Sequence, residues 1–174
     1  MAPAALPTVP AVQAEQLTRR ARLIRRLYLG LIAVFLSLGL AGVYGSRTAT
    51  VTATANGYTL RVIYPKVTRS SLPIKWQLLV THPGGFTGSV TVAVPIDYFN
   101  LFDFNNFYPL PDSTVNQGGT MIMVFSAPVG DTLDVLLDAR TQAGLRAGQR
   151  TSTAVLAGDG QPLVAVRYGT RVLP

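Results

Sequence analysis

The stretch LYLGLIAVFLSLGLAGVYG, from Leu27 to Gly45, dominates the N-terminal part of this sequence. Its nineteen residues carry no charge, and Ser37 is its only clearly polar side chain. A helix of this length would extend about 28 Å at 1.5 Å per residue, close to the thickness of the hydrocarbon layer of a bilayer. Length and composition therefore predict one transmembrane helix over residues 27–45, with the lipid bilayer as its partner.

The residues on either side of this run predict its orientation. Tyr28 and Tyr44 lie near its two ends, where tyrosine rings favour the headgroup region. A basic juxtamembrane segment, residues 19–26, precedes the run and only Arg47 follows closely. The basic side chains before the run are Arg19, Arg20, Arg22, Arg25 and Arg26. Because basic residues are retained on the cytoplasmic side, we expect a single-pass protein of the cell membrane with a cytoplasmic N-terminus and an extracytoplasmic C-terminal domain.

A cleaved signal peptide is the main alternative to an anchor. The basic start fits one, but the apolar run is longer than the usual stretch of about 7 to 15 residues, and no clean A-x-A cleavage site follows it. A buried helix of a soluble domain is less favoured, because a run that is apolar all round is too long for a domain of this size. Anchor and signal peptide both place the rest of the chain outside the cytoplasm.

One face of the predicted helix carries small side chains. These are Gly30, Ala33, Ser37 and Ala41, at spacings of three, four and four residues. Small residues on one face let a second transmembrane helix approach closely, and the Ser37 hydroxyl offers an interhelical hydrogen bond. The pattern lacks a strict G-x-x-x-G, and such residues are common in membrane helices. It is a candidate contact with a polytopic membrane protein.

The net charge of +7 does not indicate nucleic-acid binding. Five arginines beside the apolar run account for much of it, and residues 27–174 carry ten basic and seven acidic side chains that are scattered along the sequence. Arginines in such a position contact anionic headgroups. No recognition-helix or RNA-binding signature is present. Residues 1–18, with three prolines in the first ten, are predicted to be a disordered cytoplasmic tail.

Residues 46–174 predict an antiparallel β-sandwich of seven or eight strands. Alternating β-branched runs are separated by turn residues such as Asn56-Gly57, Gly118-Gly119 and Gly158-Asp159-Gly160. The predicted strands are 48–55, 58–64, 74–80, 89–94, 120–125, 132–139, 150–156 and 162–173. In this pattern the domain resembles immunoglobulin-like and fibronectin-like domains, and Trp76 stands where a buried core tryptophan is expected. This likeness is one of architecture and carries no function.

An irregular insert, residues 95–112, interrupts the strand pattern. It contains six aromatic residues: Tyr98, Phe99, Phe102, Phe104, Phe107 and Tyr108. Asp97 is predicted to cap a short helix there. The favoured interpretation is that these rings plug one end of the sandwich as part of its core. The alternative is a docking surface, because exposed apolar patches commonly mark a partner.

The inventory of catalytic groups is small. The chain has no cysteine, and its one histidine, His82, lies in a His-Pro-Gly-Gly turn where we expect it to face solvent. Alternation places Asp134 and Asp138 on the solvent face of their strand. Asp103, Asn105 and Asn106 do not match a calcium loop. We therefore expect no enzyme activity, no cofactor and no metal.

Two hypotheses for function follow. The first is a non-catalytic accessory or assembly subunit that interacts through its helix and loops with another membrane or envelope protein. The second is a module that binds cell-envelope glycan, because β-sandwiches often carry aromatic sugar platforms. Trp76, Tyr98 or Tyr108 would be the platform residues. The sequence predicts neither the oligomeric state nor the identity of a partner.

Overall fold

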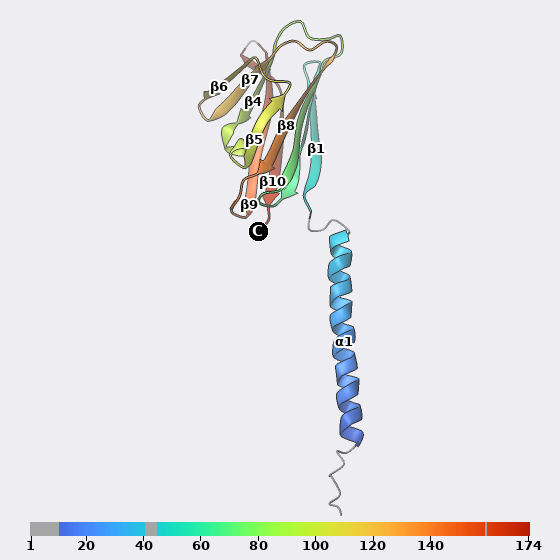
Figure 1. Ribbon diagram of the computed structural model, residues 1–174. Helices are drawn as coiled ribbons and strands as arrows, with labels where there is room; N and C mark the ends of the chain where they lie inside the picture. Colours follow the sequence, from blue (N-terminus) through green and yellow to red (C-terminus); the bar gives the residue numbers. More distant parts are fainter. Residues whose placement is uncertain (1–10, 41–44, 159) are drawn as a thin grey trace, which may run out of the picture. The chain divides into compact units, whose positions relative to one another are not determined.

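The computed structural model describes residues 11–40, 45–158 and 160–174, with side chains from residue 19 onward (Figure 1). Its contacts divide the chain into two compact units, Met1–Gly45 and Ser46–Pro174. The first unit contains one helix, and the second contains the strands and one turn of helix. The prediction of a mainly β protein with one N-terminal apolar helix is therefore confirmed.

The N-terminal helix α1 spans Ala11–Leu40. It begins directly after Pro10 and continues through residues with good helix propensity, so it includes residues 11–18 of the predicted tail. Residues 1–10 lie outside the described residues. Gly45 was predicted to end the helix, but it lies in a bend before the first strand. Within the described residues, α1 therefore covers residues 27–40 of the apolar run and also the sixteen residues before it.

Ten strands and a short helix α2, Ile96–Phe99, make up residues 46–174. The strands are β1 Arg47–Ala55, β2 Tyr58–Thr68, β3 Pro73–Thr81, β4 Val90–Pro95, β5 Phe102–Tyr108, β6 Ser113–Gln117, β7 Thr120–Phe125, β8 Thr132–Thr141, β9 Gly148–Gly158 and β10 Gln161–Val172. Eight of them coincide with predicted strands. β2 continues through Pro65, where the sequence predicts a loop, because Pro65 lies beyond the ladder to β3, which ends at Ile63, and beside a β-bulge in the ladder to β1.

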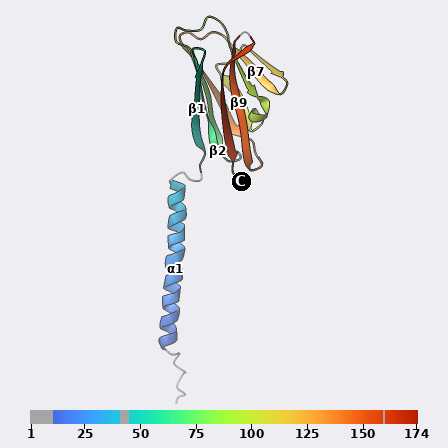
Figure 2. The same cartoon turned by 180° about the vertical axis from the view of Figure 1, so that it is seen from behind.

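The strands form one continuous sheet in the order β5-β8-β3-β2-β10-β9-β4-β7-β6, with β1 paired to β2. β2 connects the two halves, since it pairs with β3 over Thr59–Ile63 and with β10 at Val67 and Thr68. The sheet curls strongly into a half-barrel, with β1 and β7 near opposite margins (Figures 1 and 2). Because this ladder is continuous, the sheet is not clearly an immunoglobulin-like or fibronectin-like sandwich.

The core lies inside the curl and follows the alternation of the strands. Trp76 on β3 is fully buried, and Leu78 and Val80 follow it on the same face. On the neighbouring β8, Asp134 and Asp138 point to solvent as predicted, while Leu133, Val135 and Leu137 are buried. Side chains from both halves of the sheet join one hydrophobic cluster, so the domain has a single core.

β5 and β6 were not predicted, because both border or lie within the aromatic insert. β5 contains a bulge between Phe104 and Asn106, which shifts the alternation by one residue and lets both Phe102 and Phe107 point inward. The predicted cap at Asp97 is also wrong. α2 has Pro95 at its N-cap position and no side-chain cap, because the helix is a single turn that directly continues strand β4.

Candidate functional site

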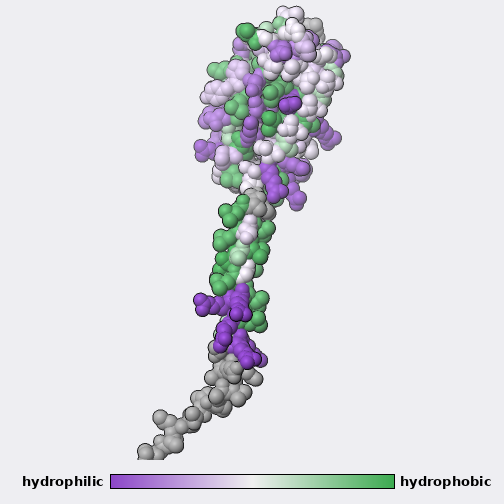
Figure 3. All heavy atoms as spheres, turned by 90° about the vertical axis from the view of Figure 1, so that its right-hand side faces the viewer, coloured by the Kyte–Doolittle hydropathy of each residue, from purple (hydrophilic) through white to green (hydrophobic). Residues whose placement is uncertain are grey.

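The helix α1 exposes an apolar surface preceded by a basic one. Every side chain from Arg19 to Leu40 is exposed, with Leu31 at 68%. This window is long and apolar enough to cross a membrane, and none of it is buried within the chain. Figure 3 shows the apolar band in green beside the purple arginines predicted for the membrane interface. Tyr28 is exposed as well, whereas Tyr44 lies outside the described residues.

The small-residue face of α1 is open in the single chain. A side chain at Gly30 would meet nothing within 4 Å. The Ser37 hydroxyl donates a hydrogen bond of 2.7 Å to the Ala33 carbonyl within the helix. This bond satisfies the hydroxyl donor and leaves its lone pairs free to accept a bond from a second helix. Ala41, the fourth predicted member, lies outside the described residues.

The aromatic insert belongs to the core. Tyr98, Phe99, Phe102 and Phe107 are each 5% exposed or less, and Phe104 is half-buried against them. Phe99 packs edge-on against Trp76, with ring centroids 5.4 Å apart. The prediction of a docking surface made by all six rings is therefore wrong, because α2 and the bulged β5 turn them inward. Only Tyr108, at 54% exposure, presents most of its ring to solvent.

Two buried tyrosines, Tyr98 in the insert and Tyr168 on β10, have raised pKa values. The Tyr98 hydroxyl lies 2.8 Å from the Thr170 hydroxyl, and its ring contacts that of Tyr168 edge-on. Burial raises the pKa of Tyr98 far above its ordinary value, and the nearby Tyr168 adds to this effect. Burial also raises the pKa of Tyr168 to about 12, partly offset by Ser152 and Trp76. The polar atoms of Tyr168, Ser152 and Trp76 lie near one another without forming hydrogen bonds of normal geometry.

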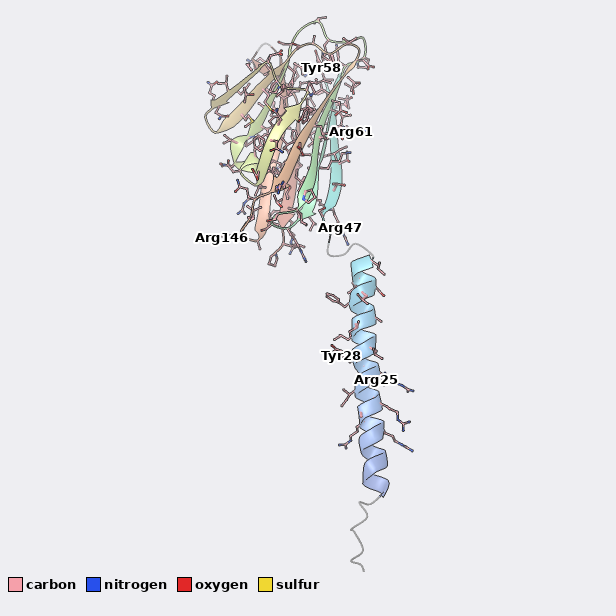
Figure 4. All side chains as sticks on the ribbon, viewed as in Figure 1. Arg25, Tyr28, Arg47, Tyr58, Arg61 and Arg146 are labelled. Carbon is pink, nitrogen blue, oxygen red and sulfur yellow. The ribbon has the colours of Figure 1, made fainter. Side chains whose placement is uncertain are left out.

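A cluster of half-buried rings lies at the end of the curled sheet where β2 begins. The rings of Tyr58 and His82 stack with centroids 4.2 Å apart, and Phe86 lies 6.3 Å from Tyr58. The Asn56-Gly57 turn, with positive φ at both residues, starts β2 at this end. His82 Nδ1 donates to the Gly57 carbonyl at 3.0 Å, because that oxygen can only accept. Figure 4 shows Tyr58 at the end of the domain opposite Arg47 and Arg146.

A hollow of about 220 Å³ opens beside these rings, and we call it the tip groove. Its lining includes Tyr58, Phe86, Thr87, Ser89, Thr91 and Leu163. None of the described lining residues is charged, and both rings and hydroxyl groups are present. Such a surface suits a neutral ligand with one apolar face. The sequence predicted that His82 faces solvent from a turn, but its ring is half-buried against Tyr58, and no sequence pattern indicates this contact between residues 24 positions apart.

Within the described part of the chain, no group of three or more histidine or carboxylate side chains is placed to hold a metal ion. Asp134 accepts both of its hydrogen bonds from the Gln77 amide, and Asp138 accepts one from Asn105. A hollow of about 360 Å³ lies beside Asp103, Asp138 and Arg140 on the outer face of β5 and β8. These are ordinary contacts of a polar outer face.

The prediction that Trp76 or Tyr98 serves as a sugar platform is wrong, because both side chains are buried in the core. Of the three predicted platform residues, only Tyr108 is accessible. The tip groove, which the sequence did not predict, contains the more accessible combination of rings and hydroxyl groups.

Comparison with known proteins places the chain in no family. No protein-family model matches it, and no curated protein matches it. Among solved structures, one match is the alkylpurine DNA glycosylase AlkC of Pseudomonas fluorescens, bound to DNA containing an abasic site analog. The identity is 10% and the TM-score 0.33, over 74% of this chain and 31% of the glycosylase. A likeness this low carries no argument about fold or activity.

Proposed function

We propose that this protein is a single-pass membrane protein whose N-terminus lies in the cytoplasm and whose β domain, residues 46–174, lies outside it. The exposed apolar surface of α1 carries this proposal. An apolar surface on all sides of a helix is stable only when lipid or another apolar partner covers it. The arginines from Arg19 to Arg26 support the orientation, because such residues stay on the cytoplasmic side.

Alkaline carbonate extraction of membranes that contain the full chain tests the anchor. We expect the chain to stay in the membrane fraction and its N-terminal sequence to include residues 19–26. Protease added to intact cells should digest the β domain. A chain that is released by carbonate and starts beyond residue 40 would instead be a secreted product of a cleaved signal peptide, and a protected β domain would reverse the orientation.

The task that we propose for this anchored domain is that of a non-catalytic accessory or assembly subunit beside a polytopic membrane protein. The open face of α1 at Gly30, Ala33 and Ser37 supports it, because small side chains permit close helix packing. The composition is consistent with it, since the sequence has one histidine and no cysteine.

In-cell crosslinking with two matched variants tests this contact. Ala33→Phe adds bulk to the small-residue face, whereas Ile32→Phe adds the same bulk about 100° away around the helix, outside that face. We expect the first variant to lose a crosslinked membrane partner that the second retains. A wild-type chain that runs as a lone monomer in mild detergent and yields no crosslinked partner would remove the support for this task.

The second candidate function is binding of a neutral cell-envelope glycan at the tip groove. Two observations favour it: the rings of Tyr58 and Phe86 border the groove, and hydroxyl groups of Thr87, Ser89 and Thr91 line it. Its volume of about 220 Å³ suits a single sugar ring. Aromatic rings bind the apolar face of a sugar, and hydroxyl groups bind its edges.

A pull-down with insoluble cell-wall polysaccharide tests this candidate. Tyr58→Ala removes a ring of the groove, and Tyr108→Ala removes an exposed tyrosine outside it. Binding that is lost only in Tyr58→Ala supports the groove. Equal binding by both variants and the wild type, or no binding by any of them, contradicts it.

A further inference from the structure

The cationic side chains of the β domain, although scattered in the sequence, gather at one end of the curled sheet. The sheet pairing brings the beginning of β1 at Arg47 next to the end of β2, and the end of β10 at Arg171 next to both the end of β2 and the beginning of β9. The beginning of β3 and the end of β8, which pair with each other, lie at the same end. Eight of the ten cations of residues 46–174 lie on these strand ends and the adjoining loops. They are Arg47, Lys66, Arg69, Lys75, Arg140, Arg146, Arg150 and Arg171. We call this region the basic end.

The charges of the basic end are available for a partner. Seven of the eight side chains are exposed, and only Arg69 is half-buried. Within the described residues, none of the eight forms an ion pair, although Asp103 lies opposite Arg140 and Asp138 opposite Lys75 in the sheet. Like charges held together in water repel one another, so an anionic partner at this end would be favourable.

The opposite end of the sheet has no such charge. The described residues there include Asp112 and Asp131 but no lysine or arginine. The two remaining cations of the domain, Arg61 and Arg167, project from within β2 and β10. Figure 4 shows Arg47 and Arg146 at the basic end and Tyr58 at the other. The domain is therefore electrically asymmetric along its strands.

The basic end is also the end at which the chain enters the domain. Arg47 is seven residues after Leu40, the last described residue of α1. Seven residues of extended chain span at most about 25 Å. If α1 is embedded in a bilayer, the first strand therefore starts close to the headgroup layer on the side where the domain lies.

From this charge asymmetry and this short connection we infer that the basic end binds anionic phospholipid headgroups of the membrane that holds α1. The inference rests on the proposed membrane anchor and adds a second, electrostatic contact to it. Exposed cations are attracted to an anionic membrane surface over about a Debye length, so the contact weakens with salt. The contact would hold the tip groove and β1–β2 turn away from the membrane, toward the cell envelope.

Energy transfer in lipid nanodiscs tests the inference on the full chain. Because the sequence has no cysteine, a dye can be attached at one engineered position. Ala143→Cys labels the loop of the basic end, and Thr87→Cys labels the opposite end. We expect transfer from the Ala143→Cys dye to headgroup-labelled lipid to be higher in discs that contain phosphatidylglycerol than in pure phosphatidylcholine, and to fall at high salt. The Thr87→Cys dye should show low transfer in both lipids.

Matched neutralised variants identify the residues. The increase in energy transfer that phosphatidylglycerol causes should be lost in the triple variant Arg146→Gln, Arg150→Gln and Arg171→Gln. It should be retained in the double variant Arg61→Gln and Arg167→Gln. Fluorescence of the single tryptophan, Trp76, reports that each variant is folded. Equal transfer in both lipids, from a chain that resists carbonate extraction, overturns the headgroup contact and leaves the anchor intact. A chain that carbonate releases from the discs overturns both.

Discussion

Two apolar regions of this chain differ in burial: the side chains of helix residues 27–40 are exposed, whereas most rings of the aromatic insert, residues 95–112, are buried. Leu31 on the helix is 68% exposed, whereas Phe99 in the insert is 1% exposed. The insert mixes its rings with polar residues such as Asp97 and Asp103, so α2 and β5 can turn one face to the core and the other to water. The helix has no such polar face.

This difference shows that the spacing of polar residues, more than total hydrophobicity, determines whether a segment can be buried in its own domain. A segment with an apolar and a polar side completes a small core. A segment that is apolar all round needs a solvent other than water or a large domain around it. Four experiments, taken in order of decreasing effect, test whether the two segments differ in this way.

Removing a buried ring of the insert should have the largest effect. Phe99→Ala leaves a cavity beside Trp76 and should lower the free energy of unfolding of the β domain by about 3–5 kcal/mol. The matched change Tyr108→Ala removes an exposed ring of the same insert and should cost less than about 1 kcal/mol. Urea unfolding followed by Trp76 fluorescence measures both. Equal losses would mean that the insert is not divided into an inner and an outer side.

A charge in the helix should act on the membrane and not on the fold of the β domain. Leu36→Arg should make membrane insertion less favourable by about 3 kcal/mol, because an arginine in the middle of a transmembrane helix is costly. We expect carbonate-extractable protein to increase while the urea midpoint of Trp76 fluorescence is unchanged. Leu36→Val is the control for shape. A variant that stays fully in the membrane would contradict the lipid environment of α1.

The buried hydroxyl pair tests how the polar end of the insert is satisfied. Thr170→Val leaves the Tyr98 hydroxyl without its partner and should cost about 1–3 kcal/mol of unfolding free energy. Adding Tyr98→Phe to that variant should recover much of the loss, because both polar atoms are then absent. The double-mutant cycle is measured by urea unfolding. Additive losses would show that the two hydroxyls do not interact.

Alkaline pH should weaken the same region by an amount that is small just above pH 10 and grows continuously as the pH rises. Burial raises the pKa of Tyr168 to about 12, above the unfolded value of 10.0, so above pH 10 the unfolded chain loses this proton before the folded one does. The stability that Tyr168 contributes is therefore complete below pH 10 and is lost as the pH rises toward 12. The slope should be about 1.4 kcal/mol per pH unit. Tyr98, whose pKa burial also raises, acts in the same direction. Tyr168→Phe should reduce the slope, and an unchanged slope would contradict this assignment.

Local sequence signals predicted most of the strands. The Asn56-Gly57 turn and the alternation of Ile74, Trp76 and Leu78 depend only on neighbouring residues, and the structure has the hairpin and the buried face where they indicate. β5 was missed because its bulge at Asn105 breaks the alternation that marks a strand. The Asp97 cap failed because α2 is too short and too closely joined to β4 for a separate N-terminal cap.

The candidate sites were harder to predict than the strands. The apolar surface of α1 is a property of consecutive residues, so it is evident in the sequence. The tip groove combines Tyr58 with Phe86, which lies in the loop between β3 and β4, and with Leu163 on β10. The docking surface predicted for the insert failed for a related reason, since the direction of each ring depends on how β5 pairs with β8.

The apolar helix, the basic segment before it and the β character of the rest are evident in the sequence alone, because each depends on residues that are adjacent or regularly spaced. The direction of the aromatic rings and the grouping of the charges depend instead on how the strands pair. Arg47, Arg146 and Arg171 are far apart in the sequence, and the charge pattern there is scattered. They meet at one end of the sheet because each antiparallel strand returns the chain to that end. The lengths of the strands and loops between these residues are not evident from the spacing of the charges in the sequence.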